Sequence, residues 1–428
     1  MKKSIVNQIP DSWSIVRLDE IVEKFIVPMR DKPKSFDGEI PWCRIEDFKG
    51  IYLSKSKSNQ NVSEETVNEM NLKVYPIGTV LVSCSADLGR CAITKVPLTT
   101  NQTFIGLFPK VRTDSLFLYY KMIDSAKKLN ILSTGTTISY LSRKQFESFQ
   151  LLFPSEIIEQ QKIAEILSTV DAKIEVIDQQ ITETQALKKG LMQRLLTKGI
   201  GHTEFKDSAL GEIPKSWEVV EIQKLIDQGS IISHLDGNHG GLYPSADEFI
   251  NEGIPYIGAN CFLNNRVDFS KCKHLSMERS LKFKKGVAKN GDVLFAHNAT
   301  VGPVAFLETN LDFVILSTTA TYYRLDNKTI DAKYWLFFLS SPIFKTQYEK
   351  VMGQSTRNQV PITMQRTFYS VLPSFEEQKE ISEILNTADN KLEILLEKKN
   401  QYQELKQGLM QQLLTGKIRV KINNTVTA

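Results

Sequence analysis

The stretch Leu187-Lys-Lys-Gly-Leu-Met-Gln-Arg-Leu-Leu-Thr197 occurs twice in this chain, the second time as Leu405-Lys-Gln-Gly-Leu-Met-Gln-Gln-Leu-Leu-Thr415. Nine of the eleven residues are identical, and the copies are 218 residues apart in a chain of 428. Agreement of this length indicates an internal duplication. Because each half is far longer than a solenoid repeat, the duplication predicts two domains, each followed by its own copy of the stretch.

Each copy closes a long helical pattern that starts close to a proline, at Pro154 in the first half and at Pro373 in the second. Along both patterns apolar residues return at alternating spacings of four and three, which is typical of the seam of a coiled coil. Polar residues interrupt the first seam late, at Thr184 and Lys188, and the second earlier, at Lys399. A helix with one apolar seam needs a partner, so we expect the two helices to pair with each other. The predicted seam residues are Ile163, Leu167, Val170, Ile174, Ile177, Ile181, Leu191 and Leu195 in the first helix, and Ile381, Leu385, Leu392, Leu395, Leu409 and Leu413 in the second.

The ends of both helices carry residues that favour capping or termination. Ser374 and Glu377 have the spacing of a capping box at the start of the second helix. Gly199 and Gly416 stand where each helix should stop. About 42 residues at about 1.5 Å each predict a helix of roughly 60 Å.

Two glycines, Gly190 and Gly408, lie inside the helical patterns at equivalent positions. Glycine destabilises a helix interior relative to alanine. The two positions indicate either local fraying of the helix or the close approach of another helix or subunit, and the sequence leaves both interpretations open.

Outside the long helices the two halves also run in parallel. Both open with Pro-x-Ser-Trp and a short alternating strand, at 9–21 and 213–226, and we expect the tryptophan to be buried at a domain edge. Further on, 77–93 matches 290–306 as strand, small-residue turn and strand. Strands outnumber helices without regular alternation, so the predicted class is α+β with an internal pseudo-twofold repeat. The predicted boundaries are 1–153 for the first domain, 154–199 for the first long helix, 200–212 for a linker, 213–372 for the second domain, 373–416 for the second long helix and 417–428 for a C-terminal tail.

Composition and charge are those of an ordinary globular protein, with 41% apolar and 24% charged residues. The net charge of +4 is uneven, because residues 1–153 carry 21 Lys and Arg against 16 Asp and Glu, whereas 201–372 carry 18 against 18. This excess suits a polyanion but is weak evidence by itself. Five cysteines without C-x-x-C spacing argue against a disulfide framework or a zinc ribbon. The sequence shows neither a signal peptide nor a long apolar span, so we expect a cytoplasmic protein with no membrane partner.

Catalytic motifs are largely missing. We find no P-loop, no G-x-G-x-x-G after a strand, and no Asp/Asn-Pro-Pro-Phe/Tyr element of the kind with which amino-methylating enzymes hold a flipped base. Glu397-Lys-Lys399 has nuclease-like spacing but lies on the predicted helix as a solvated face. His234 and His239 lack a third donor for a metal ion, and the loop between them is better suited to hydrogen-bonding an external ligand. We therefore expect no catalytic residue, no cofactor and no metal.

Two non-identical domains, each ending in a Leu-Lys-x-Gly-Leu-Met-Gln-x-Leu-Leu-Thr helix, resemble the specificity subunit of a type I restriction–modification system. The resemblance covers nearly the whole chain and is carried by 154–199, 373–419 and the two Ile-Pro-x-Ser-Trp openings. It implies two target recognition domains that each bind one half of a split, asymmetric double-stranded DNA sequence. It also implies that the helices pack antiparallel, separate the domains like a ruler and dock the partners. These partners are two modification (methyltransferase) subunits and restriction (helicase-nuclease) subunits, so the chain itself is expected not to be an enzyme.

Residues that contact DNA are expected in loops and at helix tips. Arg and Lys suit guanine, Asn and Gln suit adenine, and hydroxyl and basic groups suit phosphate. The resemblance implies an arginine in the turn after the Val-Leu-x-x strand, but here Cys84 and His297 stand there, which argues against base contact from this turn. The candidates by position are Arg44, Ser85, Arg90, Thr136, Thr137, Arg143 and Lys144 in the first domain, and Asp236, Asn238, His239, Asn260, Asn298, Thr300, Thr356, Arg357 and Asn358 in the second.

Two other functions fit parts of the pattern. A coiled-coil scaffold with two carbohydrate- or peptide-binding domains unrelated to DNA would explain the helices and the duplication. A single-chain DNA-modifying enzyme would also bind DNA, but the missing cofactor motifs argue against it. Neighbouring genes for an adenine methyltransferase and a helicase-like nuclease would separate these alternatives from the specificity subunit.

Overall fold

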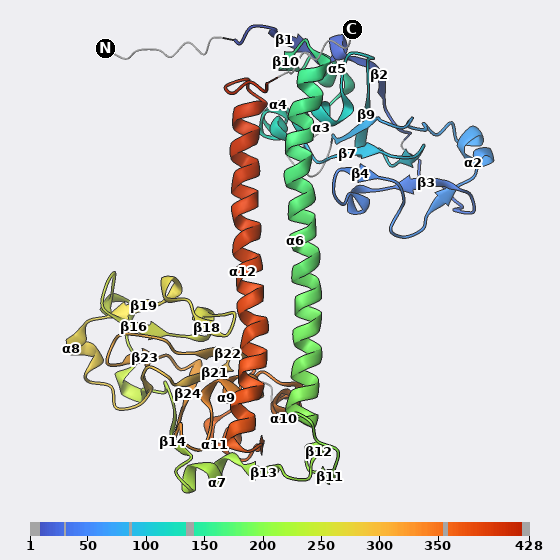
Figure 1. The fold of residues 1–428 in the computed structure, drawn as a ribbon. Coiled ribbons are helices and arrows are strands. Elements are labelled where there is room, and N and C mark those ends of the chain that lie inside the picture. The colour runs from blue at the N-terminus through green and yellow to red at the C-terminus, as the bar shows by residue number, and fades with distance from the viewer. Residues whose placement is uncertain (1–8, 30, 85–87, 134–140, 354–357, 422–428) are drawn as a thin grey trace, which may run out of the picture. The chain divides into compact units, whose positions relative to one another are not determined.

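The computed structural model describes residues 9–29, 31–84, 88–133, 141–353 and 358–421. The chain forms two compact units, the first from residues 1–179 and 397–428, the second from residues 180–396. Two long helices, α6 (Ile157–Lys198) and α12 (Phe375–Leu413), each contribute one part to each unit (Figure 1). The division between the units therefore runs through the helices, whereas the sequence pattern placed domain boundaries at the helix ends.

The first unit is built on a five-stranded sheet in the order β2-β9-β6-β7-β4 and a three-stranded sheet in the order β5-β3-β8. Strand β1 pairs antiparallel with β10, so the start of the domain is held against the strand that leads into α6. One apolar core joins the larger sheet, helix α3 and the ends of both long helices. The elements are β1 (Trp13–Arg17), α1 (Leu18–Ile21), β2 (Val22–Ile26), β3 (Ile40–Cys43), β4 (Tyr52–Leu53), β5 (Asn61–Val62), α2 (Glu64–Glu69), β6 (Val80–Ser83), β7 (Cys91–Thr94), β8 (Thr99–Thr100), β9 (Phe104–Pro109), α3 (Ser115–Asp124), α4 (Ala126–Leu132), α5 (Arg143–Glu147) and β10 (Gln150–Pro154), with the 3-10 turn η1 (Ile45–Asp47).

The second unit repeats this plan with a six-stranded sheet, β14-β24-β21-β22-β18-β17, and a five-stranded sheet, β15-β19-β16-β23-β20. Strand β13 pairs antiparallel with β25, which leads into α12, as β1 pairs with β10 in the first unit. The elements are β11 (Phe205–Ser208), β12 (Gly211–Pro214), β13 (Glu218–Glu221), α7 (Ile222–Asp227), β14 (Ile231–Asp236), β15 (Phe249–Ile250), β16 (Ile254–Ile257), β17 (Phe262–Leu263), β18 (Arg266–Val267), β19 (Lys273–Leu275), α8 (Met277–Ser280), β20 (Val287–Ala288), β21 (Val293–Asn298), β22 (Thr300–Phe306), β23 (Val314–Leu316), β24 (Ala320–Leu325), α9 (Ala332–Leu339), α10 (Pro342–Met352), α11 (Ile362–Arg366) and β25 (Tyr369–Leu372), with 3-10 turns η2 (Gly240–Leu242), η3 (Ala246–Glu248), η4 (Ala259–Cys261) and η5 (Phe269–Lys271).

The duplication is visible in individual hydrogen bonds. Near the start of α6, Gln160 accepts the Asp114 N–H at 2.8 Å and donates to the carbonyl of the preceding proline at 3.0 Å. Near the start of α12, Gln378 accepts the Asp331 N–H at 2.9 Å and donates to its own preceding proline at 3.1 Å. Asp114 and Asp331 in turn cap helices α3 and α9. The same buried amide therefore joins each domain to its long helix, as an internal repeat requires.

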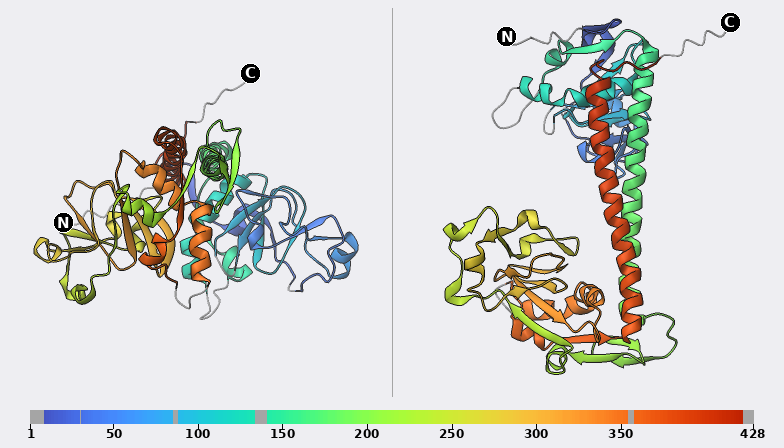
Figure 2. Two further views of the ribbon diagram at one scale, coloured as in Figure 1. Left: turned by 90° about the horizontal axis from the view of Figure 1, so that it is seen from below. Right: turned by 60° about the vertical axis from the view of Figure 1, so that its left-hand side comes forward.

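The two long helices pair antiparallel. In the first unit Asp171 of α6 lies 2.6 Å from Lys406 of α12, and Asp178 lies 2.6 Å from Lys399, so residue numbers rise along one helix as they fall along the other. Within each unit the two helix segments lie side by side (Figure 1, Figure 2). This pairing, with mixed strands and helices in both domains, confirms the predicted fold class.

Most of the predicted seam residues are buried in the structure. Thr184, which interrupts the apolar pattern, is also buried and donates its hydroxyl to the Gln180 carbonyl at 2.7 Å. Four of the predicted residues are only partly buried, namely Ile174, Leu191, Leu392 and Leu409. The buried ones are Ile163, Leu167, Val170, Ile177, Ile181, Leu195, Ile381, Leu385, Leu395 and Leu413.

The glycines inside the helices do not interrupt them. Both α6 and α12 continue through Gly190 and Gly408. No heavy atom lies within 4 Å of the position that a Cβ would take on either residue. The helices are thus not frayed at these points, and both glycines leave open space for a neighbour.

Three local features add detail to the sequence interpretation. The Ser374 hydroxyl accepts the Glu377 N–H at 3.3 Å, but the Glu377 carboxylate accepts other donors, so only half of the capping box forms. Residues 200–212, assigned to a linker, contain β11 and the start of the β12 strand that pairs with it. The tail is held by Arg419, whose Nε lies 2.6 Å from Glu159.

Within the described ranges, no helix is both long and apolar enough to cross a membrane. All five cysteines are buried free thiols.

Candidate nucleic-acid interface

One edge of the six-stranded sheet collects several candidate residues of the second domain. Strand β14 ends at Asp236, β21 ends at Asn298 and β22 begins at Thr300. Because β14, β24, β21 and β22 are successive antiparallel neighbours, these strand ends lie at the same edge of the sheet. We call it the β14–β22 edge.

The turn between β21 and β22 is tied to a second candidate segment. Ala299, with φ of 64°, makes the turn and donates its N–H to the Asn358 carbonyl at 3.0 Å. The Asn358 side chain returns a bond from Nδ2 to the Ala299 carbonyl at 3.1 Å. Asn358 therefore joins Asn298 and Thr300 at the β14–β22 edge. Thr356 and Arg357, which precede it, lie outside the described residues.

Asn260 reaches the same edge from the other sheet. It is exposed in η4, and its Nδ2 donates to the Lys271 carbonyl at 3.4 Å. The neighbouring Ala259 N–H donates to the Thr319 hydroxyl at 2.9 Å, immediately before β24. The exposed Asn260 amide, the hydroxyls of Thr300 and Thr319, and the loop after β14 therefore lie together, contributed by both sheets.

The loop after β14 has its own internal order. The Asp236 carboxylate accepts the Asn238 N–H at 3.3 Å, and the Asn238 amide oxygen accepts the Gly240 N–H at 3.3 Å. His239 points inward, since its Nε2 lies 2.7 Å from the Leu316 carbonyl and only 9% of the residue is exposed. Burial also lowers the pKa of His239. Asn238 is therefore the exposed polar group of this loop, whereas His239 holds the loop to the sheet.

Two lysines that the sequence analysis did not select lie beside this loop. A hollow of about 310 Å³ is lined by Asn238 and by the exposed residues Lys284 and Lys285, among others. Paired ammonium groups beside a loop of amide groups are the residue types that hold phosphate. The basic run Lys282-Phe-Lys-Lys285 could have indicated these lysines from the sequence, although an ordinary charged surface turn has the same residue pattern.

Behind the β14–β22 edge the second domain holds a buried polar layer. The Gln365 amide oxygen lies 2.9 Å from the Tyr323 hydroxyl and 3.2 Å from both the Thr321 hydroxyl and His234 Nε2. Burial lowers the pKa of His234 to about 3 and also lowers that of His297. Both imidazoles are therefore neutral at physiological pH and add no positive charge to the edge. No three His, Cys, Asp or Glu side chains gather as a metal site anywhere in the part of the chain that the structure describes.

The equivalent positions of the two domains confirm that the Val-Leu-x-x strands correspond. In the first domain the Leu141 N–H donates to the Cys84 carbonyl at 2.9 Å, and in the second the Val360 N–H donates to the His297 carbonyl at 2.8 Å. Both Cys84 and His297 are buried, at 5% and 2% exposure. Neither side chain reaches the surface of its turn.

The described candidates of the first domain are mostly engaged with other side chains. Arg44 caps η1, pairs with Glu46 at 2.9 Å and lies over the Trp42 ring at 5.7 Å. Arg143 pairs with Glu147 at 2.7 Å along α5, and Lys144 beside it is exposed.

Arg90 lies beside the long helix α6. It donates to the Phe48 carbonyl at 3.0 Å and lines a hollow of about 790 Å³ with Asp171 and Asp178 of α6. Ser85, Thr136 and Thr137 lie outside the described residues.

Known proteins are similar to this chain in sequence and in fold. The family model for the type I restriction modification DNA specificity domain matches twice, at residues 10–186 and 214–407. The MjaVIII type I restriction enzyme specificity subunit of Methanocaldococcus jannaschii is 28% identical over 97% of this chain and 95% of its own length. The putative MjaX specificity subunit of the same organism is 27% identical over 98% and 97%. The crystal structure of the type I restriction-modification S subunit from M. genitalium matches with a TM-score of 0.60 and 15% identity, over 98% of this chain and 99% of that one.

The solved structure supports the fold alone, because its sequence identity is low. The two family matches together span most of the chain, and each contains one domain with part of the following helix. The chain belongs to the family of type I restriction–modification DNA specificity subunits, the non-catalytic DNA-recognition components of these systems.

Proposed function

We propose that this chain binds an asymmetric, bipartite DNA target, with one half-site contacted by each domain, and docks the modification and restriction subunits of its complex. The observation that carries the proposal is a repeated scaffold with different surface residues. The strands around Cys84 and His297 make the same backbone hydrogen bonds, yet the side chains offered nearby differ. Two equivalent scaffolds with different contact residues suit two different half-sites.

The long helices provide two equivalent docking surfaces. In the second unit Leu187 of α6 is 57% exposed, one turn from Gly190. In the first unit Leu405 of α12 is 49% exposed, one turn from Gly408. An exposed leucine beside a glycine with open space lets a partner helix approach closely. Because the surface occurs once in each unit, it fits two copies of a modification subunit.

The β14–β22 edge of the second domain, with the lysines beside it, carries side chains whose chemistry suits DNA. Asn260, Asn298 and Asn358 provide amides that suit adenine, and Lys284 and Lys285 provide charges that suit phosphate. In the first domain Arg44, Arg143 and Lys144 remain proposed contacts. Arg44 and Arg143 would exchange their present carboxylate partners for DNA.

The test is to express the chain with modification subunits and map methylated adenines across the genome. We expect two subunits per chain by analytical ultracentrifugation and one bipartite motif in the map. Replacing residues 213–372 by the matching domain of a relative should change one half of the motif only. A monomer that ignores the modification subunits, or a replacement that alters both half-sites, would overturn the proposal. Neither the chain nor this complex should cleave DNA without restriction subunits.

A further inference from the structure

Two lysines at seam positions, Lys188 in the first long helix and Lys406 in the second, form equivalent contacts in the two units. Lys406 of α12 pairs with Asp171 of α6 in the first unit, and Lys188 of α6 pairs with Asp389 of α12 in the second. Each lysine and each aspartate is 218 residues from its counterpart. In the sequence, each lysine is a polar residue at a position where the seam pattern calls for an apolar one. The structure shows that each one faces a carboxylate on the partner helix.

In the first unit the aspartate also contacts the recognition domain. Asp171 Oδ1 lies 2.6 Å from Lys406, and Oδ2 accepts the Tyr120 hydroxyl of α3 at 2.7 Å. Burial first, and then the bond to Asp171, raises the pKa of Tyr120, so this hydroxyl stays protonated and donates. Lys406 lies over the Tyr120 ring at 5.7 Å. One carboxylate thus joins both long helices and the first domain.

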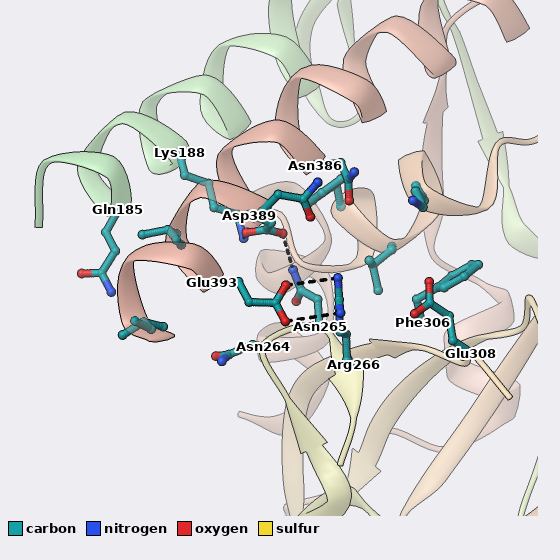
Figure 3. Close-up of a pocket in the computed structure, with 16 residues that line it drawn as sticks. Gln185, Lys188, Asn264, Asn265, Arg266, Phe306, Glu308, Asn386, Asp389 and Glu393 are labelled. Carbon is teal, nitrogen blue, oxygen red and sulfur yellow. Dashed lines mark hydrogen bonds and ion pairs between the residues drawn. The ribbon is translucent and has the colours of Figure 1, made fainter. Parts of the chain in front are cut away.

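In the second unit Asp389 has the same arrangement (Figure 3). One carboxylate oxygen pairs with Lys188, and the other accepts Nδ2 of Asn265 at 3.0 Å. Lys188 lies over the Phe337 ring of α9 at 5.7 Å, as Lys406 lies over Tyr120. Asn265 belongs to the two-residue turn between β17 and β18. A second pair beside it, Arg266 to Glu393 at 3.2 Å, holds the same turn on α12.

These contacts are well shielded from water. The side chains of Asp171 and Lys406 are 20% and 23% exposed, and those of Asp389 and Lys188 are 23% and 19% exposed. Ion pairs at this depth are screened less than surface pairs, and the loss of one partner leaves the other charge without compensation. Polar contacts inside an apolar seam also favour one register over others.

We infer that Asp171 and Asp389 are positioning residues for DNA recognition, each of which locks one domain to the paired helices at a set register and orientation. The inference rests on the proposed function and extends it. The half-site bases are selected at the loops, whereas the two aspartates set how each domain is presented and so which spacing between half-sites is accepted. A domain freed from its aspartate keeps its base contacts but tolerates other spacings.

The test uses the full complex and compares matched variants by methylome mapping. Tyr120→Phe removes the domain contact of Asp171, and Tyr119→Phe on the same helix is its control. Asn265→Gly removes the domain contact of Asp389, and Asn264→Gly is its control. Asn264 and Asn265 both have positive φ, of 50° and 62°, so glycine fits either backbone position.

We expect unchanged half-site bases in both test variants. The preference for the native spacing over spacings one base pair longer or shorter should fall by roughly tenfold, since hydrogen bonds to charged groups are among the stronger ones. The two control variants should keep the parental spacing. Asp389→Ala should have a larger effect than Asn265→Gly, and if it fails to fold, Asn265→Gly alone decides.

Two results would overturn the inference while leaving the proposed function intact. One is methylation that falls evenly at all spacings, which would show that the aspartates contribute stability only. The other is a change of bases within a half-site. A parental map without a bipartite motif would remove the proposed function and this inference together.

Discussion

Glu377 and Glu159 occupy equivalent places near the starts of α12 and α6, yet they accept different donors. Glu377 accepts Trp217 Nε1 at 2.9 Å and lies 2.9 Å from His202 Nε2, all within the second unit. Glu159, which is fully buried, accepts both Nε and Nη2 of Arg419 at 2.6 and 2.9 Å. The duplication has kept the carboxylate and its place, but not its partners.

This difference shows what the joint between domain and helix requires. A buried carboxylate needs charge compensation or several hydrogen bonds, and either set of donors satisfies it. In the second unit the donors come from residues next to the domain start. In the first unit the donor, Arg419, lies at the opposite end of the chain, and it also bonds Asp11 and Ser12. The first joint is therefore complete only when residues from both ends are present.

The largest effect should come from Glu377→Ala, which removes the acceptor of Trp217 Nε1 and of the Ile200 N–H at 3.0 Å. Buried donors left unpaired each cost about 1–3 kcal/mol, so we expect a loss of roughly 3 kcal/mol or more in the free energy of unfolding. Thermal and denaturant unfolding would measure it. The exposed neighbour Glu376→Ala is the control, and equal effects of both variants would contradict the proposed joint.

A smaller loss is expected for Arg419→Ala, which leaves Glu159 buried without its cation. We expect about 2 kcal/mol, less than for a fully buried pair, because Arg419 is 38% exposed and water can replace it. Denaturant unfolding again measures the loss, with exposed Lys417→Ala as the matched change. An Arg419 variant as stable as the Lys417 variant would mean that the tail contributes nothing to the first joint.

The domain interiors offer a third contrast. Gln365, the fourth residue of α11, collects hydrogen bonds from Tyr323 and Thr321, whereas Phe146, the fourth residue of α5, is buried in the apolar core. Gln365→Leu should cost roughly 1–3 kcal/mol by leaving those hydroxyls unpaired. Phe146→Leu should cost a similar amount by lost packing alone. Replacing Tyr323 by Phe in the Gln365→Leu background should recover part of the loss, and no recovery would contradict the hydrogen-bond account.

The smallest effect concerns pH. Lys121 donates to the Leu414 carbonyl at 2.8 Å, whereas the equivalent residue of the second unit is the apolar Phe338. Burial lowers the pKa of Lys121 from 10.5 to about 8. The unfolded chain therefore binds more protons than the folded one between about pH 8 and 10.5, so this group makes stability rise with pH through that window. Relative to Lys121→Met, the parent should gain less than about 1 kcal/mol between pH 7.5 and 8.5. Parallel melts at both pH values would show it, and a constant difference would refute the buried-charge assignment.

Much of the fold followed from patterns within short windows. The repeat, the pairing of the two long helices, the α+β class and the match between 77–93 and 290–306 all rest on spacing or repetition in the sequence, whereas the antiparallel direction of the helices was implied only by the family resemblance. Trp13 and Trp217 are buried at 6% and 1% exposure, as their repeated setting indicated. Local periodicity survives in the structure because a helix or strand must present its apolar residues to one side.

The residues of the candidate site were harder to predict from local sequence patterns than the fold. Position near a turn selected Asn298, Thr300 and Asn358, which lie together at the β14–β22 edge. It also selected His239, which is buried, and Arg90, which lies beside α6. Residue type and turn position do not tell whether a side chain points outward or pairs with a neighbour, because that depends on contacts from distant segments.

The sequence by itself determined that two related domains are each followed by a long helix with an apolar seam, since duplication and periodicity are properties of the chain. Only the tertiary structure decided the partners of the polar residues. Lys188 meets Asp389, Lys406 meets Asp171, and Glu159 meets Arg419 across some 200 residues or more of chain. Such pairs form because burial demands a partner for each charge, and folding, not sequence order, brings that partner within reach.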